Sequence, residues 1–178
     1  MSRRLSRQNP GARFRRLATV MLLVAACHPA ASGEARADDR CVIERVIDGD
    51  TVVCTGGTRV RLLLIDTPEM DQGEFGARAR EALRTLLPPR TVVRMEYDLD
   101  RLDRYGRTLA YLYLPDGRMA NVEMARAGYA VAISYPPNVR HINEVRAAVA
   151  EARSARRGLW AGSAFECEPV AHRRGDCE

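Results

Sequence analysis

Two aspartates, two arginines and one glutamate in this sequence are of the types that hydrolysis of a phosphate diester requires. Asp50 and Asp66 offer carboxylate oxygens, the ligands that a hard cation such as Ca²⁺ prefers. Arg61 and Arg107 offer planar guanidinium groups that bind two phosphoryl oxygens at once, which a lysine cannot do. Glu69 follows a proline, three residues beyond Asp66, and could position or deprotonate a water molecule. We therefore expect a hydrolytic site for a phosphate diester.

These residues lie in short fragments, each of which alone is an ordinary turn or loop sequence. Three of the fragments are VIDGDT at 46–51, VRLLLIDTPE at 60–69 and DRYGR at 103–107, and the fourth spans 121–128. Arg61 and Asp66 flank an apolar run, where charged groups need partners. We expect them to converge with Asp50 around a metal ion. A structural ion pair of Arg61 with Asp66 or Glu69 is the alternative.

The pattern of apolar residues and turns predicts an α+β fold. Strands are expected over residues 41–47, 51–55, 59–65, 91–97 and 109–114. Helices are expected over 75–87, 121–127 and 139–157, with Asn121 as the N-cap of the second and Gly128 just after its end. Five short strands with about three α-helices between them are typical of a five-stranded OB-fold β-barrel.

Over about residues 41–160 the sequence resembles the staphylococcal nuclease (thermonuclease) family, whose SNase-like domain is an OB-fold barrel. The resemblance is carried by the same four fragments. It implies that Asp50 and Asp66 bind Ca²⁺, together with the main-chain carbonyl of Thr67. It also implies an enzyme that cuts DNA and RNA at the bond to the 5′ oxygen and leaves 3′-phosphate ends.

The resemblance assigns roles around the phosphate as well. Arg61 and Arg107 would hold the scissile phosphate and stabilise the transition state, and Glu69 would be the general base. The residues that match positions lining the nucleotide pocket of family members are Arg104, Tyr105 and Tyr135. The protein is expected to act as a monomer with nucleic acid as its substrate.

Two features depart from the family pattern. Ile133 stands where the family has a tyrosine, and the loop over residues 70–73 is shorter. The first change predicts weaker stacking on a base, and the second a less tightly held Glu69. A non-catalytic OB-fold module that binds nucleic acid or an envelope ligand is the alternative function. The presence of both carboxylates, both arginines and the glutamate favours the enzyme.

Most of the positive charge lies in the first residues of the chain. The net charge is +5, but seven of the 28 basic residues and one of the 23 acidic residues fall within residues 1–37. The rest of the chain, with 21 basic and 22 acidic residues, is near neutral. Its overall charge gives no reason to expect a polyanionic partner, so that inference depends on individual arginines.

Residues 1–37 have the pattern of a secretory leader. Six arginines precede the apolar run 17–26, which is too short for a permanent membrane-spanning helix, and residues 35–37 fit a small-x-small cleavage site. Residues 24–27 also resemble a lipoprotein box, in which Cys27 would be lipidated and would be the sole membrane contact. Both cuts remain open. We expect an exported protein that is periplasmic, envelope-anchored or secreted.

Either cut leaves four cysteines in the folded part: Cys41, Cys54, Cys167 and Cys177. An even number in a small exported domain favours two disulfides, for which three connectivities exist. A hairpin near residues 48–49 would bring Cys41 close to Cys54, and we pair Cys167 with Cys177 in the tail. Metal binding by the cysteines is the alternative. The expected organisation is a leader (1–37), a nuclease domain (38–160) and a tail (161–178).

Overall fold

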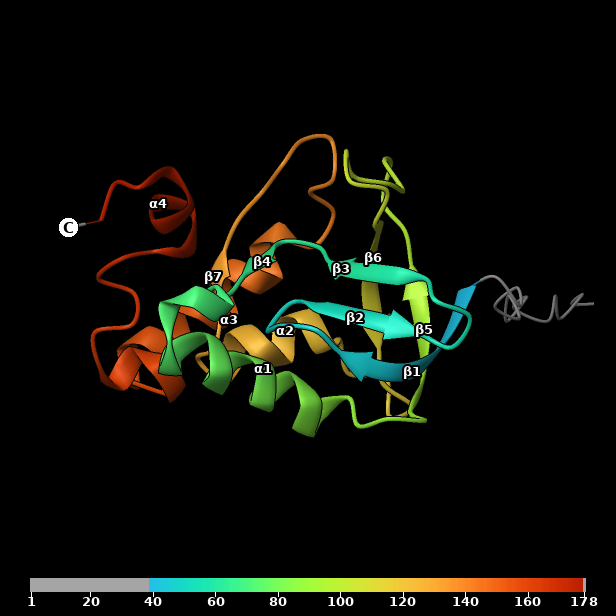
Figure 1. Ribbon diagram of the computed structural model, residues 1–178, viewed down its shortest axis with the longest axis horizontal. Coiled ribbons are helices and arrows are strands. Elements are labelled where there is room, and N and C mark those ends of the chain that lie inside the picture. Colours follow the sequence, from blue (N-terminus) through green and yellow to red (C-terminus); the bar gives the residue numbers. More distant parts are fainter. Residues whose placement is uncertain (1–38, 178) are drawn as a thin grey trace, which may run out of the picture. The chain divides into compact units, whose positions relative to one another are not determined.

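Five strands pair into a closed barrel in the computed structural model, which describes residues 39–177 (Figure 1). They are β1 (Arg40–Val46), β2 (Thr51–Cys54), β3 (Arg59–Leu62), β5 (Val92–Glu96) and β6 (Thr108–Tyr113). Their order around the barrel is β1-β2-β3-β6-β5, and β1 pairs with β5 to close it. Neighbouring strands are antiparallel except β3 and β6, which are parallel. The predicted α+β fold with a five-stranded barrel is confirmed.

Three helices of seven residues or more occur within residues 39–177, as predicted. They are α1 (Glu74–Leu86), α2 (Ala120–Arg126) and α3 (Ile142–Ser154). The apolar face of α1 buries Ala79 and Leu83, while α2 packs between β6 and α3. Shorter helical segments are η2 (Met70–Gln72), η3 (Gly158–Ala161) and α4 (Pro169–Arg174). The third helix was expected over residues 139–157, and α3 is shorter than this at both ends.

The expected strand over residues 59–65 is wrong, because the chain turns before it is complete. β3 ends at Leu62, and Leu64 has a left-handed backbone with φ of 67°. The chain then forms β4 (Ile65–Asp66), which pairs with β7 (Val131–Ala132) in a separate two-stranded sheet. The run is apolar because the turn itself is buried: Leu63 and Leu64 are 8% and 4% exposed.

Asn121 is not the N-cap of α2, which is Met119. Asn121 lies in the first turn of the helix with its side chain fully buried. Its amide nitrogen donates to the carbonyl of Leu63 at 2.8 Å, and its amide oxygen accepts from the backbone nitrogen of Leu112 at 3.0 Å. Asn121 therefore fastens the turn after β3 to strand β6. Gly128 follows the helix with φ of 83°, as predicted.

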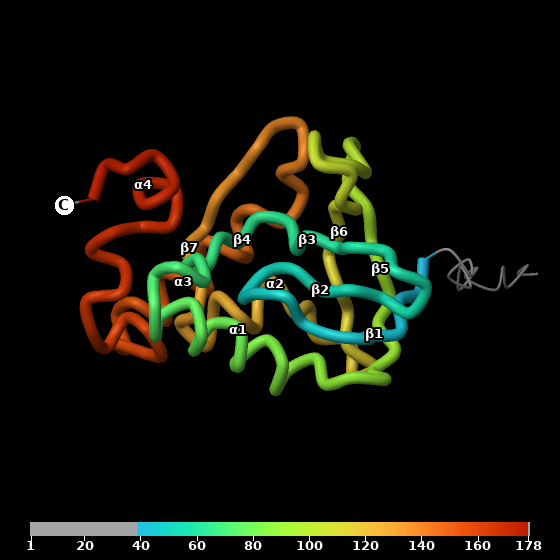
Figure 2. The backbone as a smooth tube through the Cα atoms, in the orientation of Figure 1, coloured from blue at the N-terminus to red at the C-terminus, as the bar shows by residue number. Residues whose placement is uncertain are grey.

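Both predicted disulfides are present, Cys41–Cys54 and Cys167–Cys177, so the alternative of metal-binding cysteines is wrong. The first forms because β1 and β2 pair with Ile43 opposite Cys54. The second closes the tail, here residues 162–177, around α4. The backbone trace shows the tail in red, next to the part of the fold that carries β4, β7 and the start of α1 (Figure 2).

The predicted leader, residues 1–37 with Cys27, lies outside the described residues. The division into a domain over 38–160 and a tail over 161–178 also stays a prediction. Of the helices within residues 39–177, none is long and apolar enough to span a membrane.

Candidate active site

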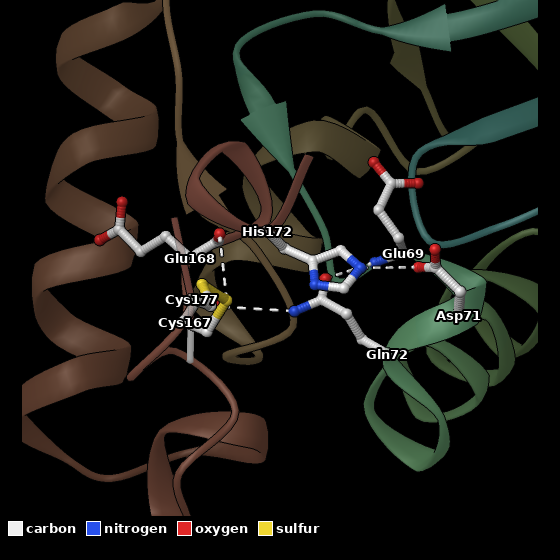
Figure 3. Close-up of a disulfide and its surroundings, with 7 residues drawn as sticks. All are labelled: Glu69, Asp71, Gln72, Cys167, Glu168, His172 and Cys177. Atoms are coloured by element: carbon white, nitrogen blue, oxygen red, sulfur yellow. Dashed lines mark hydrogen bonds and ion pairs between the residues drawn. A yellow bond between two sulfur atoms is a disulfide. The ribbon is translucent and has the colours of Figure 1, made fainter. Parts of the chain in front are cut away.

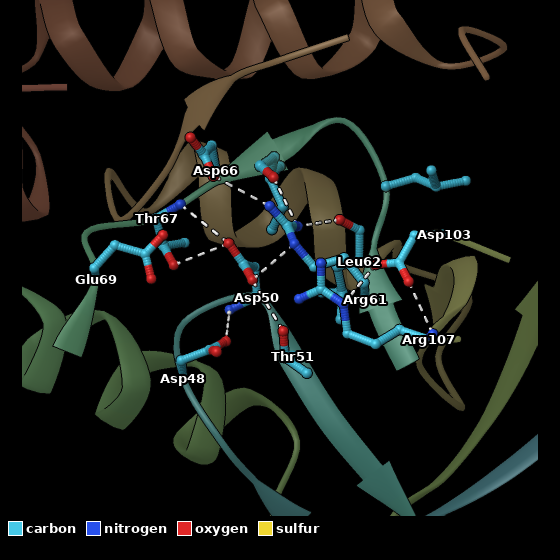
Figure 4. Close-up of polar contacts among 12 residues, drawn as sticks. Asp48, Asp50, Thr51, Arg61, Leu62, Asp66, Thr67, Glu69, Asp103 and Arg107 are labelled. Atoms are coloured by element: carbon cyan, nitrogen blue, oxygen red, sulfur yellow. Dashed lines mark hydrogen bonds and ion pairs between the residues drawn. The ribbon is translucent and has the colours of Figure 1, made fainter. Parts of the chain in front are cut away.

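Asp50 stands at the end of the β1–β2 turn and is almost completely buried. Its Oδ1 accepts a hydrogen bond from the hydroxyl of Thr51 at 3.1 Å. Its Oδ2 accepts from the backbone nitrogen and the hydroxyl of Thr67, at 3.2 and 3.1 Å (Figure 4). The packing is close enough that a Cβ at Gly49 would lie 2.6 Å from the hydroxyl oxygen of Thr67. Glycine in the turn therefore allows Asp50 and Thr67 to meet.

Arg61 connects the two aspartates. Antiparallel pairing of β2 with β3 sets Arg61 opposite Thr51, the neighbour of Asp50. Its Nε lies 3.0 Å from Oδ1 of Asp50, and its Nη2 lies 3.1 Å from Oδ1 of Asp66. Its Nη1 donates to the main-chain carbonyls of Leu62 and Ile65, on either side of the turn. The Arg61–Asp66 pair, expected as an alternative, is formed, but as part of a larger cluster that includes Asp50.

The cluster holds several carboxyl groups in a buried place, and burial disfavours their charged forms. Burial raises the pKa of Asp66, and a hydrogen bond from Arg173 and the positive charge of Arg61 oppose this rise. Burial and the nearby charge of Asp50 raise the pKa of Asp48 to about 6. Oδ1 of Asp48 accepts from the backbone nitrogen of Asp50 at 3.1 Å. Three carboxyl groups therefore crowd one place, which a positive charge would stabilise.

Glu69 is held by its backbone. Its nitrogen donates to Oε1 of Gln72 at 2.8 Å, and its carbonyl oxygen accepts from the nitrogen of Gln72 at 3.0 Å. The first turn of α1 packs directly on it, since a Cβ at Gly76 would lie 2.1 Å from the carbonyl oxygen of Glu69. The side chain of Glu69 is 36% exposed, and its Oε1 accepts from Arg173 at 2.6 Å. The carboxylate thus borders solvent while its backbone is fixed.

Arg107 precedes β6 and is held by Asp103 rather than by a carboxylate of the cluster. Its Nε lies 2.6 Å from Oδ2 of Asp103, whose Oδ1 accepts from the backbone nitrogens of Arg107 and Tyr105. Burial raises the pKa of Asp103, but these hydrogen bonds outweigh burial and leave the pKa lowered. Parallel pairing of β3 with β6 brings the start of β6 beside the strand of Arg61.

One cleft of about 730 Å³ joins these groups. The predicted site residues that line it are Asp50, Arg61, Glu69, Arg104, Tyr105, Arg107 and Tyr135. The remaining two, Asp66 and Thr67, are buried next to Asp50. Tyr105 and Tyr135 are 67% and 64% exposed, and Nη2 of Arg104 donates to the hydroxyl of Tyr105 at 2.6 Å. The volume lies within the usual range for pockets that bind small ligands, roughly 300–1,000 Å³.

The sequence reasoning missed several residues of the cleft, among them Asp48 and Arg173. Asp48 was treated only as part of a turn. Arg173 belongs to α4, outside the predicted nuclease domain, and its guanidinium binds Asp66 and Glu69. The only sequence signal for Arg173 was the predicted disulfide that closes the tail around it.

The donors available for a metal ion are few. Within residues 39–177 no three side chains of histidine, cysteine, aspartate or glutamate form a group that could hold an ion. An ion at Asp50 and Asp66 would therefore also need main-chain oxygen, such as that of Thr67, and water. Such an all-oxygen set fits Ca²⁺, which takes six to eight oxygen ligands including carbonyls and water.

Comparison with known proteins agrees with this geometry. The family model described as staphylococcal nuclease homologue matches residues 59–162, more than half of the chain. The chain belongs to the staphylococcal nuclease family. Thermonucleases from Staphylococcus intermedius and Staphylococcus hyicus are 38% and 34% identical to it, over 67% and 65% of this chain and 74% and 72% of their own lengths. Endonuclease YhcR from Bacillus subtilis is 30% identical over 74% of this chain, which spans 12% of that protein.

The family predicted from the sequence is thus confirmed, and the chain is a nuclease of this family. Its matched segment contains β3, the turn at Leu64 and the helices that support Glu69. Asp50, just before β2, and Arg173 on α4 lie on either side of that segment.

Proposed function

We propose that the protein is an exported, Ca²⁺-dependent phosphodiesterase that hydrolyses DNA and RNA and leaves 3′-phosphate ends. The observation that carries this proposal is the cluster of Asp50, Asp66 and Arg61 beside a cleft that Glu69 and Arg107 line. This arrangement combines donors for a hard cation, planar donors for a phosphate and a carboxylate exposed to water. Hydrolysis of a phosphate diester needs all three.

The roles we assign are those that the family resemblance implies. Asp50, Asp66 and the carbonyl of Thr67 would hold Ca²⁺, which when bound would polarise the phosphate and neutralise its charge. Four of the five N–H donors of Arg61 go to the two aspartates and the two carbonyls. The fifth, on Nη2, would bind the phosphate together with Arg107. Glu69, which borders solvent, would orient a water molecule and accept its proton. The exposed rings of Tyr105 and Tyr135, with Arg104, would contact the nucleotide.

Assays on plasmid DNA and on RNA test this proposal. We expect cleavage with Ca²⁺ and none with a calcium chelator, and products that a polymerase extends only after phosphatase treatment. Asp50→Asn should abolish cleavage, whereas Asp116→Asn, a change in the exposed turn between β6 and α2, should not. A protein that binds DNA but does not cut it with Ca²⁺ would instead be a binding module.

Export is a separate proposal that the two disulfides support, because disulfides persist in oxidising compartments outside the cytosol. Intact-mass analysis of the protein recovered from its host would test it. A mass that begins after residue 37 identifies cleavage by an ordinary signal peptidase, and a lipid-modified Cys27 identifies a membrane-anchored protein. A full-length mass contradicts export through this leader.

A further inference from the structure

Arg173 covers a carboxylate to which we assign the cation. Its Nη1 and Nη2 contact Oδ1 and Oδ2 of Asp66 at 3.1 and 2.8 Å, and Nη1 also contacts Oε1 of Glu69 at 2.6 Å. The side chain of Asp66 is 1% exposed, so its oxygens have little access to other partners. A guanidinium that covers both oxygens of a carboxylate leaves them poorly available to a metal ion.

Contacts of the tail with residues 71–72 hold Arg173 in this position. Figure 3 shows His172 beside Asp71, and Gln72 directed at the tail, next to Glu69. Nε2 of His172 lies 2.9 Å from Oδ1 of Asp71, and Nε2 of Gln72 donates to the carbonyl of Cys167 at 3.4 Å. A helix as short as α4 is not stable alone in water. The disulfide and these contacts therefore hold it against the active site.

Arg173, which makes these contacts, lies in a part of the chain that the family model does not match. The family model ends at residue 162, whereas the disulfide and α4 begin beyond it. The tail thus follows the matched segment, and Arg173 is the residue by which it reaches the cleft.

We propose that the tail is a latch that a divalent cation displaces: Arg173 occupies Asp66 and Glu69 until the ion binds, and then releases both. This inference rests on the proposed function, because it requires an ion at Asp50 and Asp66. The latch regulates that same site, because Glu69 cannot serve as a base while it is paired with Arg173. The latch keeps the enzyme inactive where divalent cations are scarce.

The charges favour such an exchange. Asp50, Asp66 and Glu69 carry three negative charges against the two positive charges of Arg61 and Arg173, and the carboxyl group of Asp48 lies beside Asp50. A dication in place of Arg173 would therefore bring more positive charge to carboxyl groups that outnumber their cations. The Arg173 side chain is 37% exposed, so it can leave for solvent without opening the core.

Calorimetric titration with CaCl₂ alone, in the absence of nucleic acid, tests the latch. Arg173→Gln should bind Ca²⁺ about fivefold more tightly than the parent. In the parent, Ca²⁺ must first break the ion pair of Arg173, and the free energy of a partly exposed ion pair corresponds to about this factor in affinity. Arg174→Gln, which removes the same charge from the neighbouring residue of α4, should leave the affinity unchanged. Replacing Cys167 and Cys177 by serine should also tighten binding, because the freed tail holds Arg173 less well.

Hydrogen exchange supplies a second readout. In the parent protein, Ca²⁺ should increase exchange of backbone amides in residues 167–177 and decrease it around Asp50. Equal affinities for the parent and Arg173→Gln, or weaker binding by Arg173→Gln, would overturn the latch while leaving the Ca²⁺ site intact. If neither protein binds Ca²⁺, the proposed metal site fails and the latch fails with it.

Discussion

Nη2 of Arg61 lies 3.1 Å from Oδ1 of Asp66, although the two residues are five positions apart in the sequence. On a continuous strand, residues separated by an odd number of positions point to opposite faces. They meet here because the chain turns at Leu64, and the same guanidinium donates to the carbonyls on both sides of that turn. Arg61 therefore stabilises the backbone turn that brings Asp66 to it.

Arg61→Lys should impair both function and stability. An ammonium group cannot reproduce the separate contacts with Asp50, Asp66 and the two carbonyls. We expect DNA cleavage to fall by about 10²–10³-fold, as for loss of a donor to a developing oxyanion. The free energy of unfolding should fall by about 1–3 kcal/mol, because buried acceptors lose their donor.

Initial rates on plasmid DNA and urea unfolding measure these two effects. Arg45→Lys, a change at an exposed position of β1, is the control for a general effect of the substitution. Parent-like values for Arg61→Lys in both measurements would show that a positive charge alone suffices at this position.

Glu69→Gln should separate binding from hydrolysis. The amide keeps the size of the side chain but cannot accept a proton from water, so cleavage should fall by about 10²–10⁴-fold. Affinity for a nucleotide should change little, because Arg61 and Arg107 are intact. Equilibrium binding and single-turnover cleavage give the two quantities, with the exposed Glu74→Gln as the matched control. Cleavage at the parent's rate would exclude Glu69 as the base.

Much of the barrel and of the site could be predicted from local patterns. Three such patterns are the Asp-Gly-Asp turn, the alternation of apolar and polar residues in β1 and the glycine after α2. Each reflects a conformational preference of residues that are neighbours in the sequence. The turn at Leu64 could not be predicted in this way, because the run of three leucines and one isoleucine contains no residue type that favours a turn. A left-handed leucine is unfavourable by itself and is held here by hydrogen bonds from Arg61 and Asn121.

Arg173 could not be predicted for a related reason. Its partners Asp66 and Glu69 are more than 100 residues away, and an arginine in a short polar segment is ordinary for a surface helix. The disulfide that positions it was predictable, but the face on which the tail would pack was not. Only the fold shows that residues 69–72 bind the tail.

Gly76→Ala should reduce activity although alanine is the better helix former. The new methyl group would lie 2.1 Å from the carbonyl oxygen of Glu69, so the backbone that carries the base must move. Displacement of a catalytic group by about 1 Å can cost on the order of 10²-fold in rate. Gly162→Ala is the control, since nothing lies within 4 Å of its added carbon. A parent-like rate for Gly76→Ala would show that Glu69 does not depend on this contact.

The link between the barrel and α3 should depend on pH through Glu96. Its Oε1 lies 2.9 Å from Nε2 of His141 and 3.1 Å from Nη1 of Arg140. Burial raises the pKa of Glu96, but the hydrogen bonds from His141 and Arg140 outweigh burial and leave the pKa below its ordinary value of 4.5. The ionised form is therefore the one that stabilises the fold.

Glu96→Gln should lower the free energy of unfolding at neutral pH by about 1 kcal/mol or less, because Arg140 is half exposed and Glu96 and His141 are only partly buried. A lowered pKa in the folded state adds stability above pH 4.5, and this stability is lost as the pH falls through the folded value. The difference between the parent and Glu96→Gln should thus be present at neutral pH and disappear in acid. Urea unfolding across this range measures it, and a difference that persists in acid would indicate lost packing rather than lost charge.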